Sequence, residues 1–70
     1  KELLSGLTPK LIATLKTLFE HNLQLNATAE ALGIHRHTLT YRLEKIRATC
    51  QLDPLQFQDA IKLQIALWFE

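Results

Sequence analysis

The chain has 70 residues, 47% of them hydrophobic, and a formal net charge of +1. A chain of this length forms one small domain and buries only about 60% of the surface that its unfolded form exposes. The single cysteine, Cys50, cannot form an internal disulfide, and no clustered Cys/His pattern indicates a metal. No apolar run approaches the roughly 20 residues of a membrane span, and we expect no membrane partner.

Positive charge is concentrated in one part of the sequence. Between Gly33 and Thr49 lie four basic residues and one acidic residue, whereas the rest of the chain carries four basic and six acidic residues. Because a polyanion responds to the local distribution of charge, this segment is the candidate binding element. Its basic residues are Arg36, Arg42, Lys45 and Arg47.

Apolar residues that recur three and four apart predict helices throughout the chain. The first helix begins with a capping residue followed by proline, Thr8-Pro9, and should end near His21. The preceding segment is expected to dock loosely on the core through its leucines. The apolar stripe of this helix is Leu11, Ile12, Leu15, Leu18 and Phe19.

A second, short helix is expected from Ala27 to Leu32, with Asn26 as its capping residue. Gly33 should end it, because glycine adopts a positive φ without a side-chain penalty. The two helices that flank this glycine then define a helix, a turn and a second helix.

The third helix is expected from about Arg36 to Thr49. At 100° per residue, its leucines and isoleucine share one face, whereas His37 and Tyr41 lie on the opposite face and point outward. The core residues of this helix are Leu39, Leu43 and Ile46.

The fourth helix should begin at Asp53-Pro54, with Gln56 completing a capping box. Its apolar residues span about 200° of the helix surface, which is more than a thin domain needs. We therefore expect part of this face to pack against another subunit or domain. The residues are Phe57, Ala60, Ile61, Leu63, Ile65, Leu67 and Trp68.

Two helices separated by a glycine turn, the second of them basic, match the helix-turn-helix description. The steep crossing needs a small residue at the contact, which Ala29 supplies, and Ile34 can fill the seam between the helices. The sequence thus predicts an all-α fold, a small bundle of about four helices over residues 1–70 that contains a helix-turn-helix.

The second helix of such a pair enters the major groove of double-stranded DNA with its N-terminal residues at the base edges. Arg36 can bind a guanine edge or a phosphate, the threonines can contact phosphate or thymine methyl groups, and Tyr41 offers a rigid ring with a phenol tip. Arg42 could instead pair with an acid such as Glu30. The candidate DNA-binding residues are His35, Arg36, His37, Thr38, Thr40, Tyr41, Arg42 and Lys45.

The stretch NATAEALGIHRHTLTYRLEKI closely resembles the C-terminal helix-turn-helix domain of bacterial regulators of the purine-catabolism and sugar-diacid (PucR/CdaR) type. The resemblance covers nearly the whole chain, and I-H-R-x-T-L-x-Y-R-L is its most specific part. A more distant likeness is to the DNA-binding domains of the factor for inversion stimulation (Fis) and of nitrogen-regulation activators. At three positions the chain departs from the family pattern: His37 replaces asparagine, Gln51 replaces glycine, and Ala60 replaces arginine.

The resemblance implies a cytoplasmic, nucleoid-associated transcriptional regulator and places His35, Arg36, Thr38, Tyr41 and Arg42 in its recognition helix. It also implies a ligand-sensing region N-terminal to this domain, through which a small-molecule effector would act. Because one domain of near-zero net charge should bind DNA weakly, we expect a homodimer on two half-sites in the intact protein.

Other functions have less support in the sequence. His35 and His37 diverge by about 200° on a helix, which argues against a shared metal ion. A nucleophilic Cys50 would need a base, and no carboxylate pair, triad or phosphate loop indicates an enzyme or a cofactor. The remaining alternative is a helical protein–protein interaction or dimerisation module that binds no DNA, which the wide apolar face of the last helix favours.

Overall fold

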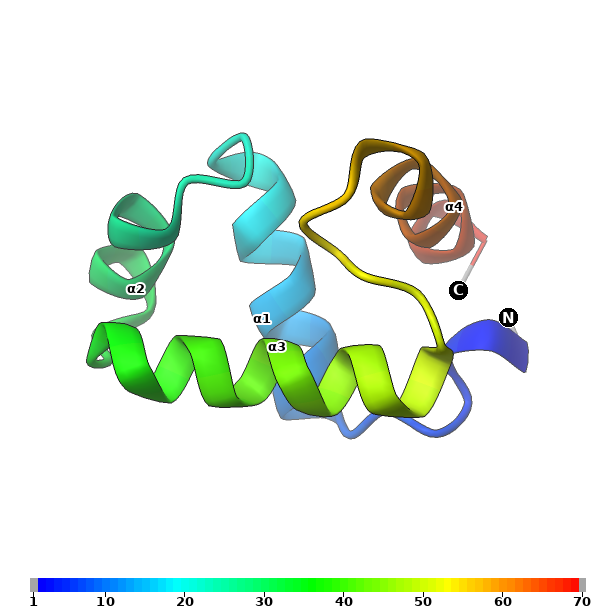
Figure 1. Ribbon diagram of the computed structural model, residues 1–70, viewed down its shortest axis with the longest axis horizontal. Coiled ribbons are helices and arrows are strands. Elements are labelled where there is room, and N and C mark those ends of the chain that lie inside the picture. The colour runs from blue at the N-terminus through cyan, green and yellow to red at the C-terminus, as the bar shows by residue number, and fades with distance from the viewer. Residues whose placement is uncertain (1, 70) are drawn as a thin grey trace.

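The computed structural model describes residues 2–69, which form helices joined by turns (Figure 1). An all-α bundle of four α-helices is therefore confirmed for this part of the chain. The elements are a 3₁₀ turn η1 (Glu2–Leu4), α1 (Pro9–Glu20), α2 (Leu25–Leu32), α3 (Arg36–Cys50) and α4 (Phe57–Trp68).

The core lies where α1 crosses behind α3 (Figure 1). α1 packs against both α2 and α3, and α4 covers η1 and α1. Burying each large aliphatic side chain contributes on the order of 1.5–3 kcal/mol, which matters in a chain with so few of them. The side chains with no exposed surface include Leu15, Leu18, Leu39, Ile46 and Leu63.

Both ends of α1 follow from local hydrogen bonds. The hydroxyl of Thr8 accepts the backbone N–H of Leu11 at 3.2 Å, and Pro9 occupies the first helical position, as predicted. At the other end Asn22 has a φ of 56°, and the N–H of Leu23 donates to the Leu18 carbonyl at 2.9 Å. This is a Schellman ending, and it turns the chain directly into α2.

α2 begins at Leu25, so the expected start at Ala27 with Asn26 as the cap is wrong. Gln24 is the N-cap and makes no hydrogen bond with its side chain, and Asn26 lies within the first turn. The cause is the tight ending of α1, in which Leu23 also has a positive φ, 65°. The connection between the two helices is therefore short, and α2 begins at Leu25, which packs against the core.

The turn after α2 is as predicted. Gly33 has a φ of 69°, and its N–H donates to the Glu30 carbonyl at 3.1 Å. The N–H of Ile34 donates to the Ala29 carbonyl at 3.0 Å, which completes a second Schellman motif. Ala29 is buried and Ile34 packs on the core, so these two residues fill the seam between α2 and α3.

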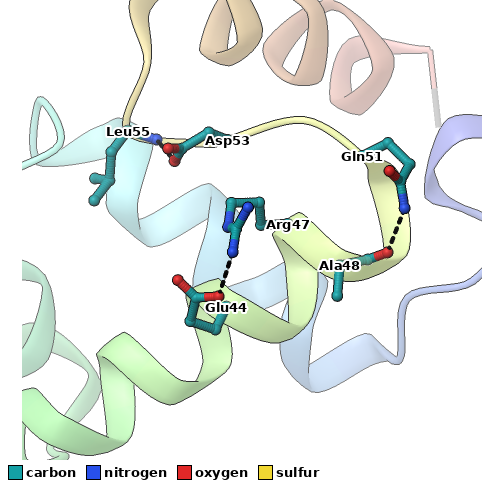
Figure 2. Close-up of polar contacts among 6 residues, drawn as sticks. All are labelled: Glu44, Arg47, Ala48, Gln51, Asp53 and Leu55. Atoms are coloured by element: carbon teal, nitrogen blue, oxygen red, sulfur yellow. Dashed lines mark hydrogen bonds and ion pairs between the residues drawn. The ribbon is translucent and has the colours of Figure 1, made fainter.

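The connection to α4 differs from the prediction, because Asp53-Pro54 does not begin the helix. The carboxylate of Asp53 accepts the N–H of Leu55 at 2.9 Å, which closes a turn around the buried Pro54 (Figure 2). The carboxylate of Asp59 accepts the Asp53 N–H at 2.9 Å and ties this turn to α4. With the carboxylate of Asp53 used in the turn, the helix begins at Phe57.

Candidate nucleic-acid interface

α3 runs along one side of the molecule, with α2 across its beginning and α1 behind it (Figure 1). Its buried face follows the helical period through Leu39, Leu43, Ile46 and Cys50. The opposite face is bare: His37 and Tyr41 are exposed, the tyrosine to 62%. The prediction that Tyr41 points outward is therefore confirmed.

The candidate residues divide into an exposed set and one half-buried arginine. We call the exposed set the outer face of α3. Arg36 stands at its first position, and within residues 2–69 its side chain has no hydrogen-bond or ion-pair partner. The outer face comprises His35, Arg36, His37, Thr38, Thr40, Tyr41 and Lys45.

The beginning of α3 is capped by a histidine, which sequence reasoning did not find. The ring Nδ1 of His35 accepts the backbone N–H of His37 at 3.1 Å, and the two rings lie 4.8 Å apart. Because Nδ1 accepts, the ring proton is on Nε2, which faces away from the helix end. His35 is thus held in one orientation at the start of the outer face. The sequence signal for this cap was the position of His35, one residue before the expected start of the helix at Arg36, where an N-cap residue lies.

Two contacts restrict the middle of the outer face. The hydroxyl of Thr40 donates to the Arg36 carbonyl at 3.0 Å, which points its methyl group away from that carbonyl. The ammonium of Lys45 lies 5.5 Å from the centre of the Tyr41 ring, a cation–π distance. The aromatic ring and the positive charge are therefore presented together, one helical turn beyond His37.

Arg42 lies apart from this face. Its Nη1 donates to the hydroxyl of Thr14 on α1 at 3.3 Å, and the side chain is half-buried. The alternative pairing with Glu30 is wrong, because Arg42 lies on the side of α3 that faces α1. Thr14 is fully buried within the apolar stripe of α1, and a buried hydroxyl on a core face was the sequence signal for such a partner.

Further along α3, part of the positive charge is neutralised. The guanidinium of Arg47 donates to the carboxylate of Glu44 at 2.9 Å (Figure 2). The hydrogen bond and the charge of Glu44 raise the pKa of Arg47. Both groups are exposed, so the pair is screened by solvent. The basic residues of α3 that have no acidic partner among residues 2–69 are thus Arg36, Arg42 and Lys45.

The remaining reactive side chain is occupied by the fold. The Cys50 thiol is buried and donates to the Leu3 carbonyl at 3.2 Å, and burial raises its pKa. Among residues 2–69, His, Cys, Asp and Glu side chains form no group of three that could hold a metal ion. Over the same residues, every helix is too short or too polar to cross a membrane.

The PucR C-terminal helix-turn-helix domain family matches residues 11–69 of the chain, from the first turn of α1 to the end of α4. The chain belongs to this family. Helix-turn-helix domains of transcriptional regulators bind DNA, and the fold and the bare basic helix described above are those of such a domain.

Among its relatives is the carbohydrate diacid regulator of Escherichia coli (strain K12), 48% identical over 54 residues, which are 77% of this chain and 14% of the relative. The transcriptional activator PmfR of Paenarthrobacter nicotinovorans is 47% identical over 47 residues, 63% of this chain and 10% of that protein. The chain thus spans a small fraction of the length of these relatives, which are named as a regulator and a transcriptional activator. No solved structure matches the chain.

Proposed function

We propose that the chain binds double-stranded DNA with sequence preference, by inserting the first half of α3 into the major groove. The observation that carries this proposal is the outer face of α3, on which Arg36 has no partner within the described residues and Tyr41 is exposed to 62%. A helix that serves only the core would not need an unpaired arginine, two histidines and a tyrosine at its exposed start.

Each residue has a role in the proposed complex. Arg36 lies where it could bind the O6 and N7 atoms of a guanine, and Thr38, Thr40 and Tyr41 follow it along the groove. His35 and His37 stand at the helix start, where base edges lie closest. Lys45 supplies attraction to phosphate, and we assign Arg42 a contact at the edge of the groove combined with its structural role.

In the intact regulator we propose a homodimer on two half-sites, because a single domain with a net charge of +1 gains little from electrostatic attraction. We assign control of this dimer to a small-molecule effector that binds a region N-terminal to the domain. Binding to the chromosome places the bacterial protein in the cytoplasm, on the nucleoid.

The direct test is selection of duplexes from a randomised library, followed by fluorescence anisotropy of the selected and a scrambled duplex at several salt concentrations. We expect preference for the selected sequence and an association constant that falls steeply with salt, by about 0.9 logarithmic units per phosphate contact and decade of salt. A protein interaction module that binds no DNA would bind neither duplex, even at low salt. Absence of binding to both duplexes would refute the proposal.

A further inference from the structure

α4 is apolar on two opposite faces. Its inner face buries Ala60, Leu63, Ala66 and Leu67 against the rest of the domain. Helical rotation of 100° per residue places a second apolar stripe about 180° away from this buried face. We call this stripe the α4 ridge: Phe57, Ile61, Ile65, Trp68 and Phe69.

The α4 ridge is well exposed. Phe57, Trp68 and Phe69 expose 71%, 73% and 74% of their surface, and the two isoleucines expose 41% and 45%. A fully buried aromatic side chain removes about 150–250 Å² from water, so the ridge presents on the order of 600 Å² of apolar surface. That is at the upper end for the largest apolar patch of a soluble monomer, about 300–600 Å².

The order of residues along the ridge is symmetrical. Phe57, Ile61, Ile65 and Phe69 are each four residues apart, and they read Phe-Ile-Ile-Phe in both directions. Phe69 follows the last residue of α4 and continues its turn, because its N–H donates to the Ile65 and Ala66 carbonyls. Ridges of residues four apart interlock when two helices cross. A two-fold axis at the centre of the ridge would place Phe57 of one copy against Phe69 of the other.

A groove next to the ridge fits this arrangement. It has a volume of about 310 Å³ and lies between the end of α1 and the start of α4, with Phe19, Leu23, Phe57 and Ile61 among its lining residues. In an antiparallel crossing, Phe69 of a second copy would meet Phe57 at the mouth of this groove. An apolar recess therefore lies where the second copy would bring an exposed aromatic ring.

We propose that the α4 ridge is a self-association surface, on which a second copy of this chain packs its own α4 in antiparallel orientation about a two-fold axis. Two ridges together would bury on the order of 1,200 Å², the lower limit of specific, stable interfaces. Between Phe57 and Phe69 the only charged residues are Asp59, which binds the Asp53 N–H, and Lys62. A neutral, symmetrical ridge suits an identical ridge better than a charged partner.

This proposal supplies the contact for the homodimer suggested above, and it is tested without DNA. Trp68 is the single tryptophan of the chain and lies in the ridge, so its fluorescence reports association directly. We expect its emission to move to shorter wavelength as the concentration of the 70-residue chain rises, in parallel with a monomer–dimer equilibrium in sedimentation. Ile65→Lys and Phe69→Lys should each raise the dimer dissociation constant at least tenfold.

The matched control is Ala31→Lys, which adds the same charge at an exposed position of α2, at the other end of the molecule (Figure 1). It should leave the dissociation constant unchanged. Phe69→Lys keeps the test valid if Ile65→Lys unfolds, because Phe69 is mostly exposed and a cation at a helix C-terminus is favourable.

A chain that stays monomeric up to about 1 mM, or a control variant that weakens the dimer as much as the ridge variants do, overturns the proposal. A monomer that binds DNA would refute this proposal alone, and a dimer that does not would refute the DNA-binding function alone.

Discussion

The guanidinium of Arg42 on α3 donates to the hydroxyl of Thr14 on α1, with 3.3 Å between Nη1 and Oγ1. The same hydroxyl donates to the Lys10 carbonyl at 2.9 Å, so Thr14 is satisfied within α1 while it accepts from the arginine. The contact joins the proposed DNA-reading helix to α1 behind it, between residues that are 28 positions apart in the sequence. It acts together with the buried face of α3, whose packing turns the outer face of the helix away from the core.

This contact should be measurable as a coupling between two helices. We expect Thr14→Val and Arg42→Ala each to lower the free energy of unfolding by about 0.5–1 kcal/mol, a modest value because the arginine is half-exposed. In the double variant the losses should not add, because either change alone removes the bond. Urea unfolding of the four proteins measures this, and fully additive losses would show that the contact contributes nothing.

Arg36 and Tyr41 should affect binding without affecting stability. Both are exposed, and replacement by alanine removes no core contact. We expect Arg36→Ala and Tyr41→Ala each to weaken binding to a selected duplex by about 1–3 kcal/mol, with melting temperatures close to that of the unchanged protein. Tyr41→Phe removes only the hydroxyl group and so separates its contribution to binding from that of the ring.

The control for these variants is Lys62→Ala, which removes an exposed positive charge from α4. It should leave the preference for the selected duplex intact. If both Arg36→Ala and Tyr41→Ala bound as tightly as the parent, the assignment of the outer face of α3 as the DNA-reading surface would be wrong.

Gly33 and Gln51 both have a left-handed backbone conformation. Replacing Gly33 by a residue with a side chain should therefore lower stability, whereas replacing Gln51 by glycine should raise it. Gly33 has a φ of 69° with no atom within 4 Å of an added Cβ, so Gly33→Ala costs only backbone strain, about 1 kcal/mol. Gly33→Val should cost more, because a β-branched residue tolerates positive φ least.

Gln51 ends α3 with a φ of 61°, and its side chain donates to the Ala48 carbonyl at 2.9 Å (Figure 2). We expect Gln51→Gly to raise stability by up to about 1 kcal/mol, reduced by the loss of that bond. Thermal unfolding of the three variants measures these changes in stability. A destabilised Gln51→Gly protein would mean that the side-chain bond outweighs the strain.

Cys50 should make stability fall at alkaline pH. Burial raises the pKa of its thiol in the folded chain, so the unfolded chain loses this proton first, near the ordinary thiol pKa of about 8.5. The stabilising contribution is complete below that pH and is lost as pH rises toward the folded pKa. Urea unfolding at several pH values, compared with Cys50→Ala, isolates the effect. Identical pH slopes for the two proteins would contradict it, as would rapid alkylation of the folded thiol.

Local residue patterns were enough to predict the helices with strong periodicity and the turn between α2 and α3. Thr8-Pro9, the leucines of α3 and Gly33 act through local rules: a side-chain cap, a 3.6-residue period and a freely accessible left-handed backbone. For the same reason Tyr41 could be placed on the outside from its angle to Leu43 alone.

Where two local signals competed, long-range packing determined the outcome. Asn26 and Asp53 both looked like helix caps, but the Schellman ending of α1 started α2 earlier, and the turn around Pro54 used the carboxylate of Asp53. The bond from Arg42 to Thr14 joins residues 28 positions apart, which no local period can bring together. The excess of apolar surface on α4 was predicted from the sequence, but only packing shows which residues form the exposed α4 ridge and which are buried.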